Sequence, residues 1–169
     1  MKTSLIKAIE TKDAAKLTNA LTGFTYKAKA NKLEASNNYL DLNMLEAYSY
    51  NWWVYVKNIN GLMVFNNYPY SNTTRKHQSK MRSLLARLGI RVDLYIKTKS
   101  SLSNFSIEDV KQALLAEILS VESELAKCKR KVSAKRTELE NQIYLLKDDL
   151  NSIESLVKAS RKKSLKAVQ

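Results

Sequence analysis

The stretch from Ile107 to Ser160 contains neither glycine nor proline, and this feature most restricts what the chain can form. Nothing in it breaks a helix, and its apolar residues recur at alternating steps of four and three, the heptad pattern of helices that pack along a seam. One seam comprises Leu114, Ile118, Val121, Leu125, Cys128 and Val132, and a second comprises Leu139, Ile143, Leu146, Leu150, Ile153 and Val157. Residues 106–161 are therefore expected to be helical.

The two seams are out of phase, because the register slips by one residue between Val132 and Leu139. A single long helix with a stutter accommodates the slip, and so does a helical hairpin that turns near residues 132–136. We favour the single helix, since tight turns commonly use glycine or proline. A long exposed apolar seam favours self-association, so a homodimer through residues 114–157 is expected, with packing inside one chain as the alternative.

An aromatic β-hairpin is the clearest local feature of the first half of the chain. The run Asn58-Ile59-Asn60-Gly61 lies between two segments rich in aromatic and β-branched residues, and asparagine and glycine both tolerate positive φ. A helix follows, with Ser71 as its N-cap and Gly89 as its stop. Alternation of apolar and polar residues predicts further strands over residues 24–30 and 90–97.

These elements predict an α+β fold with a small antiparallel sheet in the order β-β-α-β. An N-terminal helix over residues 3–22 is expected beside it, and residues 31–38 are expected to be a loop or a broken strand. The predicted organisation is an α+β domain over 1–98, a linker over 99–105, a long coiled-coil-like helix or helical hairpin over 106–161, and a basic tail over 162–169.

Positive charge is concentrated on the predicted helix that follows the hairpin. The chain has a net charge of +13, and residues 70–99 hold eight basic residues with Asp93 as their one acid. Such a surface attracts phosphate, although a solvated helix face is the alternative. The candidate nucleic-acid contacts are Arg75, Lys76, Lys80, Arg82 and Arg87, joined by Lys129, Arg130 and Lys131.

Aromatic residues of the hairpin are a second candidate feature. Trp53 and Tyr55 share one face of the predicted strand, where exposed rings could stack on unpaired bases. Burial in the core is favoured over stacking, because large aromatic residues in a small sheet are normally buried. His77 lies among cations with no acid nearby in the sequence. It is therefore a weak candidate for a general base, and a hydrogen-bonding role, a phosphate contact or surface exposure is favoured instead.

Several classes of function are not supported by any motif. The chain lacks a glycine-rich phosphate loop and the common hydrolase and metalloprotease motifs, so neither enzyme activity nor a cofactor is expected. One cysteine, Cys128, and one histidine argue against a metal cage. No segment has the apolar length of a signal sequence or a membrane span, so a cytoplasmic protein with no membrane partner is expected.

The hairpin and the start of the following helix resemble a known group of sequences. The segment is Tyr70-Ser71-Asn72-Thr73-Thr74-Arg75-Lys76-His77-Gln78-Ser79-Lys80. It resembles small accessory proteins of tailed bacteriophages, which share a strand-turn-strand followed by Tyr-Ser-x-Thr-Thr-x-Lys-His-Gln. The likeness covers residues 48–98 and implies a phage-encoded protein in the cytoplasm of an infected bacterial host, without assigning any site residue.

The sequence therefore predicts a non-enzymatic nucleic-acid-binding accessory protein that contacts phosphates through a basic helix. One alternative is a viral inhibitor or anti-defence protein that docks its basic surface on an acidic host protein. A second alternative is a component of the virion or of its assembly, organised by the C-terminal helices.

Overall fold

The computed structural model describes residues 11, 13, 15, 17, 25–129 and 133–166, without the side chains of 159–166. It divides the chain into two compact units, residues 1–104 and 105–169. The helix expected over residues 3–22 lies mostly outside the described residues. Of its described positions, Leu17 is fully buried, and its amide donates to the Asp13 carbonyl at 3.0 Å, as in a helical turn.

A seven-stranded sheet forms the centre of the first unit, and its strands lie side by side in chain order. The strands are β1 (Lys27–Lys29), β2 (Lys32–Ala35), β3 (Asn38–Asp41), β4 (Glu46–Ser49), β5 (Trp53–Ile59), β6 (Leu62–Asn66) and β7 (Leu94–Ile96). The fold is α+β as expected, but the sheet is larger than the predicted β-β-α-β sheet.

The strand β2 occupies the region expected to be a loop or a broken strand, residues 31–38, and β3 and β4 follow it. These extra strands depend on tight turns without glycine. Ser36 and Asn37 join β2 to β3 with φ values of 52° and 60°, and Tyr50 and Asn51 join β4 to β5 with 59° and 78°. Left-handed conformations of this kind suit tight hairpin turns, although glycine usually supplies them. The predicted Asn-Gly hairpin between β5 and β6 is confirmed, with Gly61 at φ 88°.

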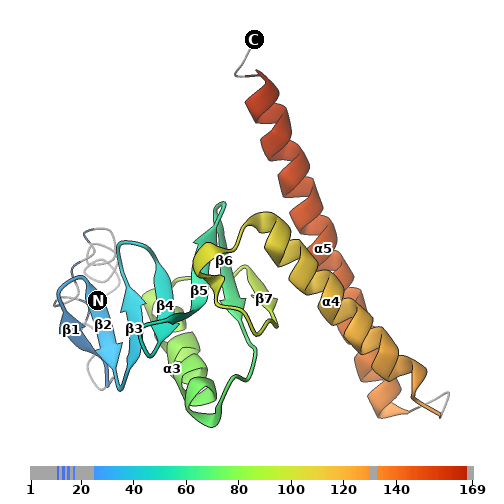
Figure 1. Ribbon diagram of the computed structural model, residues 1–169, viewed down its shortest axis with the longest axis horizontal. Coiled ribbons are helices and arrows are strands. Elements are labelled where there is room, and N and C mark those ends of the chain that lie inside the picture. Colours follow the sequence, from blue (N-terminus) through green and yellow to red (C-terminus); the bar gives the residue numbers. More distant parts are fainter. Residues whose placement is uncertain are drawn as a thin grey trace. The chain divides into compact units, whose positions relative to one another are not determined.

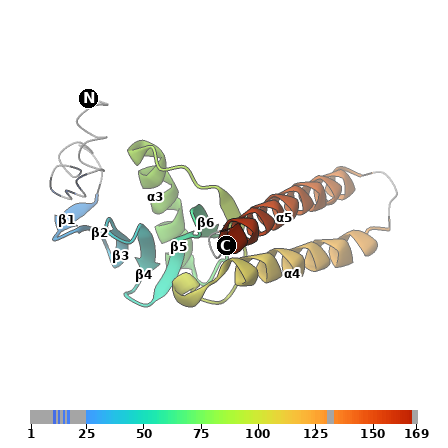
Figure 2. The same cartoon turned by 90° about the horizontal axis from the view of Figure 1, so that it is seen from above.

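The helix α3 (Asn72–Leu88) connects β6 to β7 and lies along one face of the sheet (Figures 1 and 2). Because the chain crosses over through a helix, β7 pairs with β6 in parallel, so the prediction of a wholly antiparallel sheet was wrong. The predicted ends of the helix are confirmed. The Ser71 side chain accepts from the Thr74 amide, and Gly89 ends the helix at φ 70°.

The core of the first unit lies between α3 and the sheet. The helix contributes a stripe of buried residues, Met81, Leu84, Leu85 and Leu88. They pack with apolar side chains from β2 to β6, among them Leu33, Leu40, Ala47, Val56 and Phe65. Burying this stripe fixes which face of α3 points outward.

The segment expected to be a linker, residues 99–105, belongs largely to the first unit. It contains a short 3-10 helix, η1 (Leu102–Asn104), in which Leu102 is fully buried. The amide group of Asn66 donates to the carbonyls of Thr98 and Ser100 at 2.8 and 3.2 Å. These hydrogen bonds fasten the segment to the end of β6, so it is not a free connection.

The second unit is a helical hairpin of α4 (Ile107–Ala126) and α5 (Ala134–Lys166). The favoured single long helix was therefore wrong, and the alternative hairpin is correct. Ser106 and Asp109 form the predicted capping box at the start of α4. The helix α5 continues to Lys166, into the region expected to be a basic tail.

The two heptad seams face each other across this hairpin, which explains their difference in phase. Seam residues of α4 and α5 are buried, among them Leu114, Ile118, Leu139, Ile143 and Ile153. The seam that motivated the homodimer through residues 114–157 is thus covered within one chain, and the dimer stays a prediction.

Candidate nucleic-acid interface

The outer side of α3 carries the predicted phosphate contacts, and all five are exposed. We call this surface the basic ridge, and its members are Arg75, Lys76, Lys80, Arg82 and Arg87. Helical periodicity places Lys76, Lys80 and Arg87 along one flank and Arg75 and Arg82 along the other. The structure therefore brings the central cluster of predicted residues together on one rigid element.

The basic ridge is rigid because polar side chains on the inner side of α3 attach it to the sheet. The amide group of Gln78, which is buried, donates to the carbonyls of Asn66 and Tyr68 at 2.8 and 3.0 Å. Thr74 is buried beside the capping Ser71, with 2.9 Å between their hydroxyl oxygens. Most of the polar motif at the helix start is thus explained by structure, without a ligand.

A second attachment is a buried polar network around Asn38. Its amide donates to the Tyr26 hydroxyl at 2.7 Å and to the His77 carbonyl at 3.1 Å, and its oxygen accepts from the Tyr55 hydroxyl at 2.5 Å. Burial raises the pKa of both tyrosines, so their hydroxyl groups stay protonated and able to donate. The network joins β3, β5 and α3.

His77 belongs to this inner side of α3 and not to the exposed surface. Its Nδ1 lies 2.8 Å from the Ser49 hydroxyl oxygen, and both residues are buried. Burial lowers the pKa of His77, the nearby Lys80 lowers it further, and a backbone hydrogen bond with Ser36 acts in the opposite direction. Of the roles considered for His77, hydrogen bonding is confirmed, while surface exposure and a phosphate contact are wrong.

Carboxylates are kept away from the basic ridge by the alternation of the strands. Leu33, Leu40 and Ala47 point toward α3, so their neighbours Glu34, Asp41 and Glu46 point to the other face of the sheet. There the three acids pair with lysines: Lys29–Glu34 at 3.1 Å, Lys32–Asp41 at 3.8 Å and Lys57–Glu46 at 3.1 Å.

Within the part of the chain that the structure describes, no carboxylate lies within 4.0 Å of Arg75, Lys76, Lys80 or Arg82. Arg82 has uncharged partners instead. Its guanidinium donates to the Asn67 side chain at 2.7 Å and lies 5.4 Å from the centre of the Phe65 ring. The positive charge of these four residues is therefore not neutralised by the acids that the structure describes.

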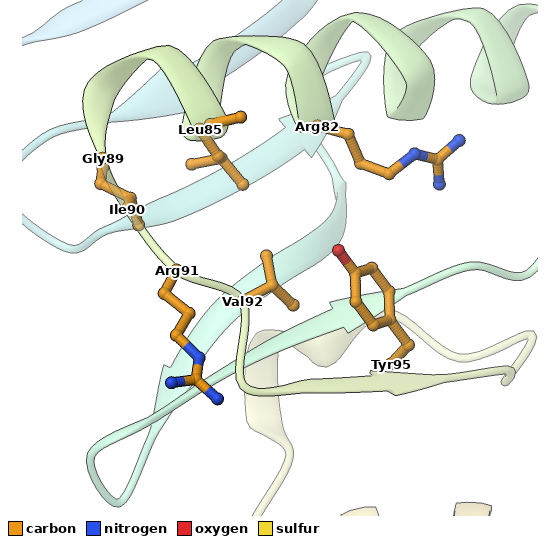
Figure 3. Close-up of a pocket in the computed structure, with 8 residues that line it drawn as sticks. Arg82, Leu85, Gly89, Ile90, Arg91, Val92 and Tyr95 are labelled. Atoms are coloured by element: carbon orange, nitrogen blue, oxygen red, sulfur yellow. The ribbon is translucent and has the colours of Figure 1, made fainter. Parts of the chain in front are cut away.

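A hollow of about 360 Å³ lies at the C-terminal end of α3, between the helix and the segment that leads to β7 (Figure 3). Its lining is mainly apolar, with Leu85, Ile90 and Val92, while the Tyr95 hydroxyl points toward the helix. Arg82 and Arg91 lie at its rim with their guanidinium groups directed outward. Arg91 lies 3.9 Å from the Asp93 carboxylate, so the rim does not extend the unpaired positive charge of α3.

Trp53 and Tyr55 are buried, so the favoured burial in the core is confirmed and the possible stacking role is wrong. The ladder between β4 and β5 shifts register after Ala47, and such a bulge turns consecutive side chains of β5 toward one face. Trp53, Tyr55 and Val56 consequently all join the core under α3. The adjacent Trp52, which the sequence reasoning did not select, is exposed instead.

The other predicted cations lie in the connection between α4 and α5. Lys129 is exposed, and Arg130 and Lys131 lie outside the described residues. They belong to the second unit, whereas the basic ridge belongs to the first. The structure therefore gives no support for treating the two groups as one site.

Comparisons of the chain with protein-family models, with curated proteins and with solved structures found no match. The resemblance of residues 48–98 to phage accessory proteins thus stays a prediction. Across the described residues, none of the helices combines the length and apolar character that a membrane crossing requires.

Proposed function

We propose that the first unit binds nucleic acid without catalysing a reaction, and that the basic ridge contacts its phosphates. One observation carries this proposal: Arg75, Lys76 and Lys80 are exposed on a rigid helix with no carboxylate partner among the described residues. A surface of this kind releases counterions from a polyanion when it binds.

The position of the cations supports a use for them beyond solubility. Lys76 and Lys80 are spaced i, i+4, so they repel each other. Arg75 and Lys76 also lie near the N-terminal end of α3, where the helix dipole already carries positive charge. Both arrangements cost stability in the free protein, and a bound anion would relieve both.

The length of α3 supports a linear polyanion as the ligand. Its 17 residues extend about 25 Å, and cations occur along most of that length. Phosphates of a nucleic-acid backbone repeat along a strand, so several can be contacted at once. A small anion would use one end of such a ridge and leave the other cations without a ligand.

The test is a fluorescence-anisotropy titration of labelled single strands and duplexes at two salt concentrations. The variant Arg75→Gln/Lys76→Gln/Lys80→Gln is expected to lower the slope of log K against log salt by about two to three units. The matched control is Lys111→Gln/Arg136→Gln/Lys147→Gln. It removes the same charge from cations that pair with carboxylates in the hairpin, so its slope should stay at the wild-type value.

Two results would overturn the proposal. The first is an absence of binding to any nucleic acid at low salt. The second is an equal loss in the two triple variants, because it would show a response to total charge and not to the ridge. Binding to polyglutamate with the same dependence on Arg75, Lys76 and Lys80 would favour the acidic-protein alternative over nucleic acid.

A further inference from the structure

Three exposed aromatic side chains lie together at the N-terminal end of α3. Tyr50 is 44% exposed, Trp52 is 56% exposed and Tyr70 is 51% exposed. Tyr50 and Trp52 come from the turn between β4 and β5, and Tyr70 immediately precedes the N-cap Ser71. We call this group the aromatic corner. Large aromatic side chains are normally buried, so an exposed group of three marks a binding surface.

The rings of the aromatic corner pack against one another and against buried rings. The rings of Trp52 and Tyr70 meet edge to face with 5.6 Å between centroids, and Tyr70 in turn lies 5.7 Å from the buried Trp53. Tyr50 packs against His77 at 5.6 Å. The exposed ring faces are therefore presented by a fixed support and do not need to be ordered when a ligand binds.

The backbone that carries Trp52 is also fixed. The Ser101 hydroxyl accepts from the Val54 amide at 3.0 Å and donates to the Trp52 carbonyl at 3.4 Å. On the other side, Trp52 is the last residue of a tight three-residue turn between the paired Ser49 and Trp53. Trp52 thus lies on a short, doubly anchored segment.

The aromatic corner adjoins the basic ridge. His77, which supports the Tyr50 ring, has Lys76 and Lys80 as neighbours along the helix, and Lys80 is close enough to lower the pKa of His77. No aspartate or glutamate occurs in the sequence between Glu46 and Asp93, and the strand acids lie on the opposite face of the sheet. Exposed aromatic rings and the exposed cations Arg75, Lys76 and Lys80 therefore occur in neighbouring parts of this unit.

A ligand that matches this surface must offer planar apolar groups and repeated negative charge together. Single-stranded nucleic acid offers both, because its base faces are free to stack while its phosphates follow the strand. A duplex keeps its base faces inside the helix and would leave the aromatic corner unused. An acidic protein surface supplies the charge without a row of planar rings.

We infer that the ligand of this site is single-stranded nucleic acid, with bases stacked on Trp52 and Tyr70 and phosphates on Arg75, Lys76 and Lys80. The inference rests on the proposed function and narrows its ligand. Stacking and phosphate contacts then make separable contributions, because removing a ring changes the affinity without changing the number of released counterions.

The first test compares Trp52→Ala and Tyr70→Ala with two controls. Tyr144→Ala removes a tyrosine of α5 that is 72% exposed, and Met44→Ala removes an exposed apolar side chain of the first unit. Each corner variant should bind a labelled oligothymidine about tenfold or more weakly than the wild type, with an unchanged salt slope. Both controls should bind as the wild type does, and duplex binding should change by less than about twofold in all four variants.

The second test uses the wild-type protein and its intrinsic fluorescence, so it does not depend on an alanine variant that folds. The chain has two tryptophans, of which Trp52 is exposed and Trp53 is buried. Oligothymidine should quench the emission of Trp52, whereas a duplex should not. In Trp52→Phe, which keeps an aromatic ring at this position, the quenching should disappear while binding is largely retained.

The outcomes separate this inference from the proposed function. Equal affinity for duplex and single strand, without quenching of Trp52, would overturn the inference and leave the proposed function standing. Failure of every nucleic acid to bind at low salt would overturn both. Polyglutamate that quenches Trp52 as oligothymidine does would overturn a nucleic-acid ligand for the aromatic corner.

Discussion

The helix α3 and the hairpin of α4 and α5 differ in whether their basic side chains have carboxylate partners. In the hairpin, three cations lie within reach of carboxylates: Lys111–Glu154 at 3.0 Å, Lys147–Glu122 at 2.8 Å and Arg136–Glu140 at 2.9 Å. On α3, the exposed Arg75, Lys76 and Lys80 have no such partner among the described residues. The net charge of +13 therefore includes cations that pair with carboxylates and cations that do not.

The first turns of α3 and α4 differ in the same way, in whether acidic residues balance positive charge. The first turn of α4 contains Glu108 and Asp109, whose negative charge suits the positive end of the helix dipole, and Asp109 completes a capping box. The first turn of α3 has no acid, and Arg75 and Lys76 follow directly. The hairpin is thus arranged for its own stability, whereas α3 keeps charge that stability alone does not explain.

The buried side of α3 attaches the helix to the sheet. The largest predicted effect on stability comes from removing hydrogen bonds of that attachment. Asn38→Ala removes hydrogen bonds to Tyr26, Tyr55 and the His77 carbonyl, and it leaves these buried groups without that partner. We expect a loss of about 3 kcal/mol in the free energy of unfolding of the first unit. Urea titration followed by tryptophan fluorescence measures it, since both tryptophans lie in this unit.

The matched control for that change is Asn141→Ala, which removes an exposed asparagine from α5. It should alter the stability of the hairpin by less than about 0.5 kcal/mol. A similar small effect for Asn38→Ala would contradict the role assigned to the buried network, and would mean that α3 is held by its apolar stripe alone.

The sequence predicted α3 and its ends well, because capping and apolar periodicity are local properties. Ser71, Gly89 and the stripe that includes Met81 and Leu85 lie where expected. It missed β2, β3 and β4 because their turns use Ser36, Asn37, Tyr50 and Asn51 in left-handed conformations. Serine and tyrosine adopt these conformations at a cost that the pairing of neighbouring strands compensates, and that pairing is not visible locally.

At the candidate site, too, the local sequence predicted some features and missed those that depend on strand pairing. Exposure of the ridge cations followed from the periodicity of α3, and burial of Trp53 and Tyr55 was the favoured interpretation. The exposed tryptophan, Trp52, was not selected as a possible stacking residue. The register shift after Ala47 turns Trp53 and Tyr55 inward and leaves Trp52 outside. A bulge is decided by how two strands pair, so the alternation of one strand could not reveal it. The hairpin was missed as the preferred form because its connection contains no glycine or proline.

The next predicted effect is a difference in acid stability between the two units. The pKa of His77 lies below its ordinary value of 6.5, chiefly because burial disfavours the charged form. As the pH falls, His77 is therefore protonated in the unfolded chain at a higher pH than in the folded chain. The first unit should lose stability as the pH falls below about 6.5, and the loss should level off below the pKa of the folded state.

In the hairpin, Lys111 lowers the pKa of Glu154. The pKa of Asp109 is lowered by the hydrogen bonds between Asp109 and Ser106. The stability that these carboxylates contribute is present above their ordinary pKa values and is lost only as the pH falls through the lower, folded-state values. As the pH is lowered, the urea midpoint of the first unit, measured by tryptophan fluorescence, should thus fall before the stability from the hairpin carboxylates is lost. His77→Gln should abolish the fall of this midpoint below about pH 6.5, and a midpoint of the wild type that is flat between about pH 7.5 and 5 would contradict the argument.

The smallest predicted effects test the comparison of charges directly. Lys80→Gln relieves repulsion with Lys76 and should stabilise the first unit by about 0.3 kcal/mol. Lys147→Gln loses the exposed pair with Glu122 and should destabilise the hairpin by a similar amount. Both shifts, measured as urea midpoints by fluorescence and by circular dichroism respectively, should vanish in about 1 M salt, where charges are screened within about 3 Å. If Lys80→Gln destabilised the first unit at low salt, Lys80 would have a favourable partner, and the claim that its charge is uncompensated would fail.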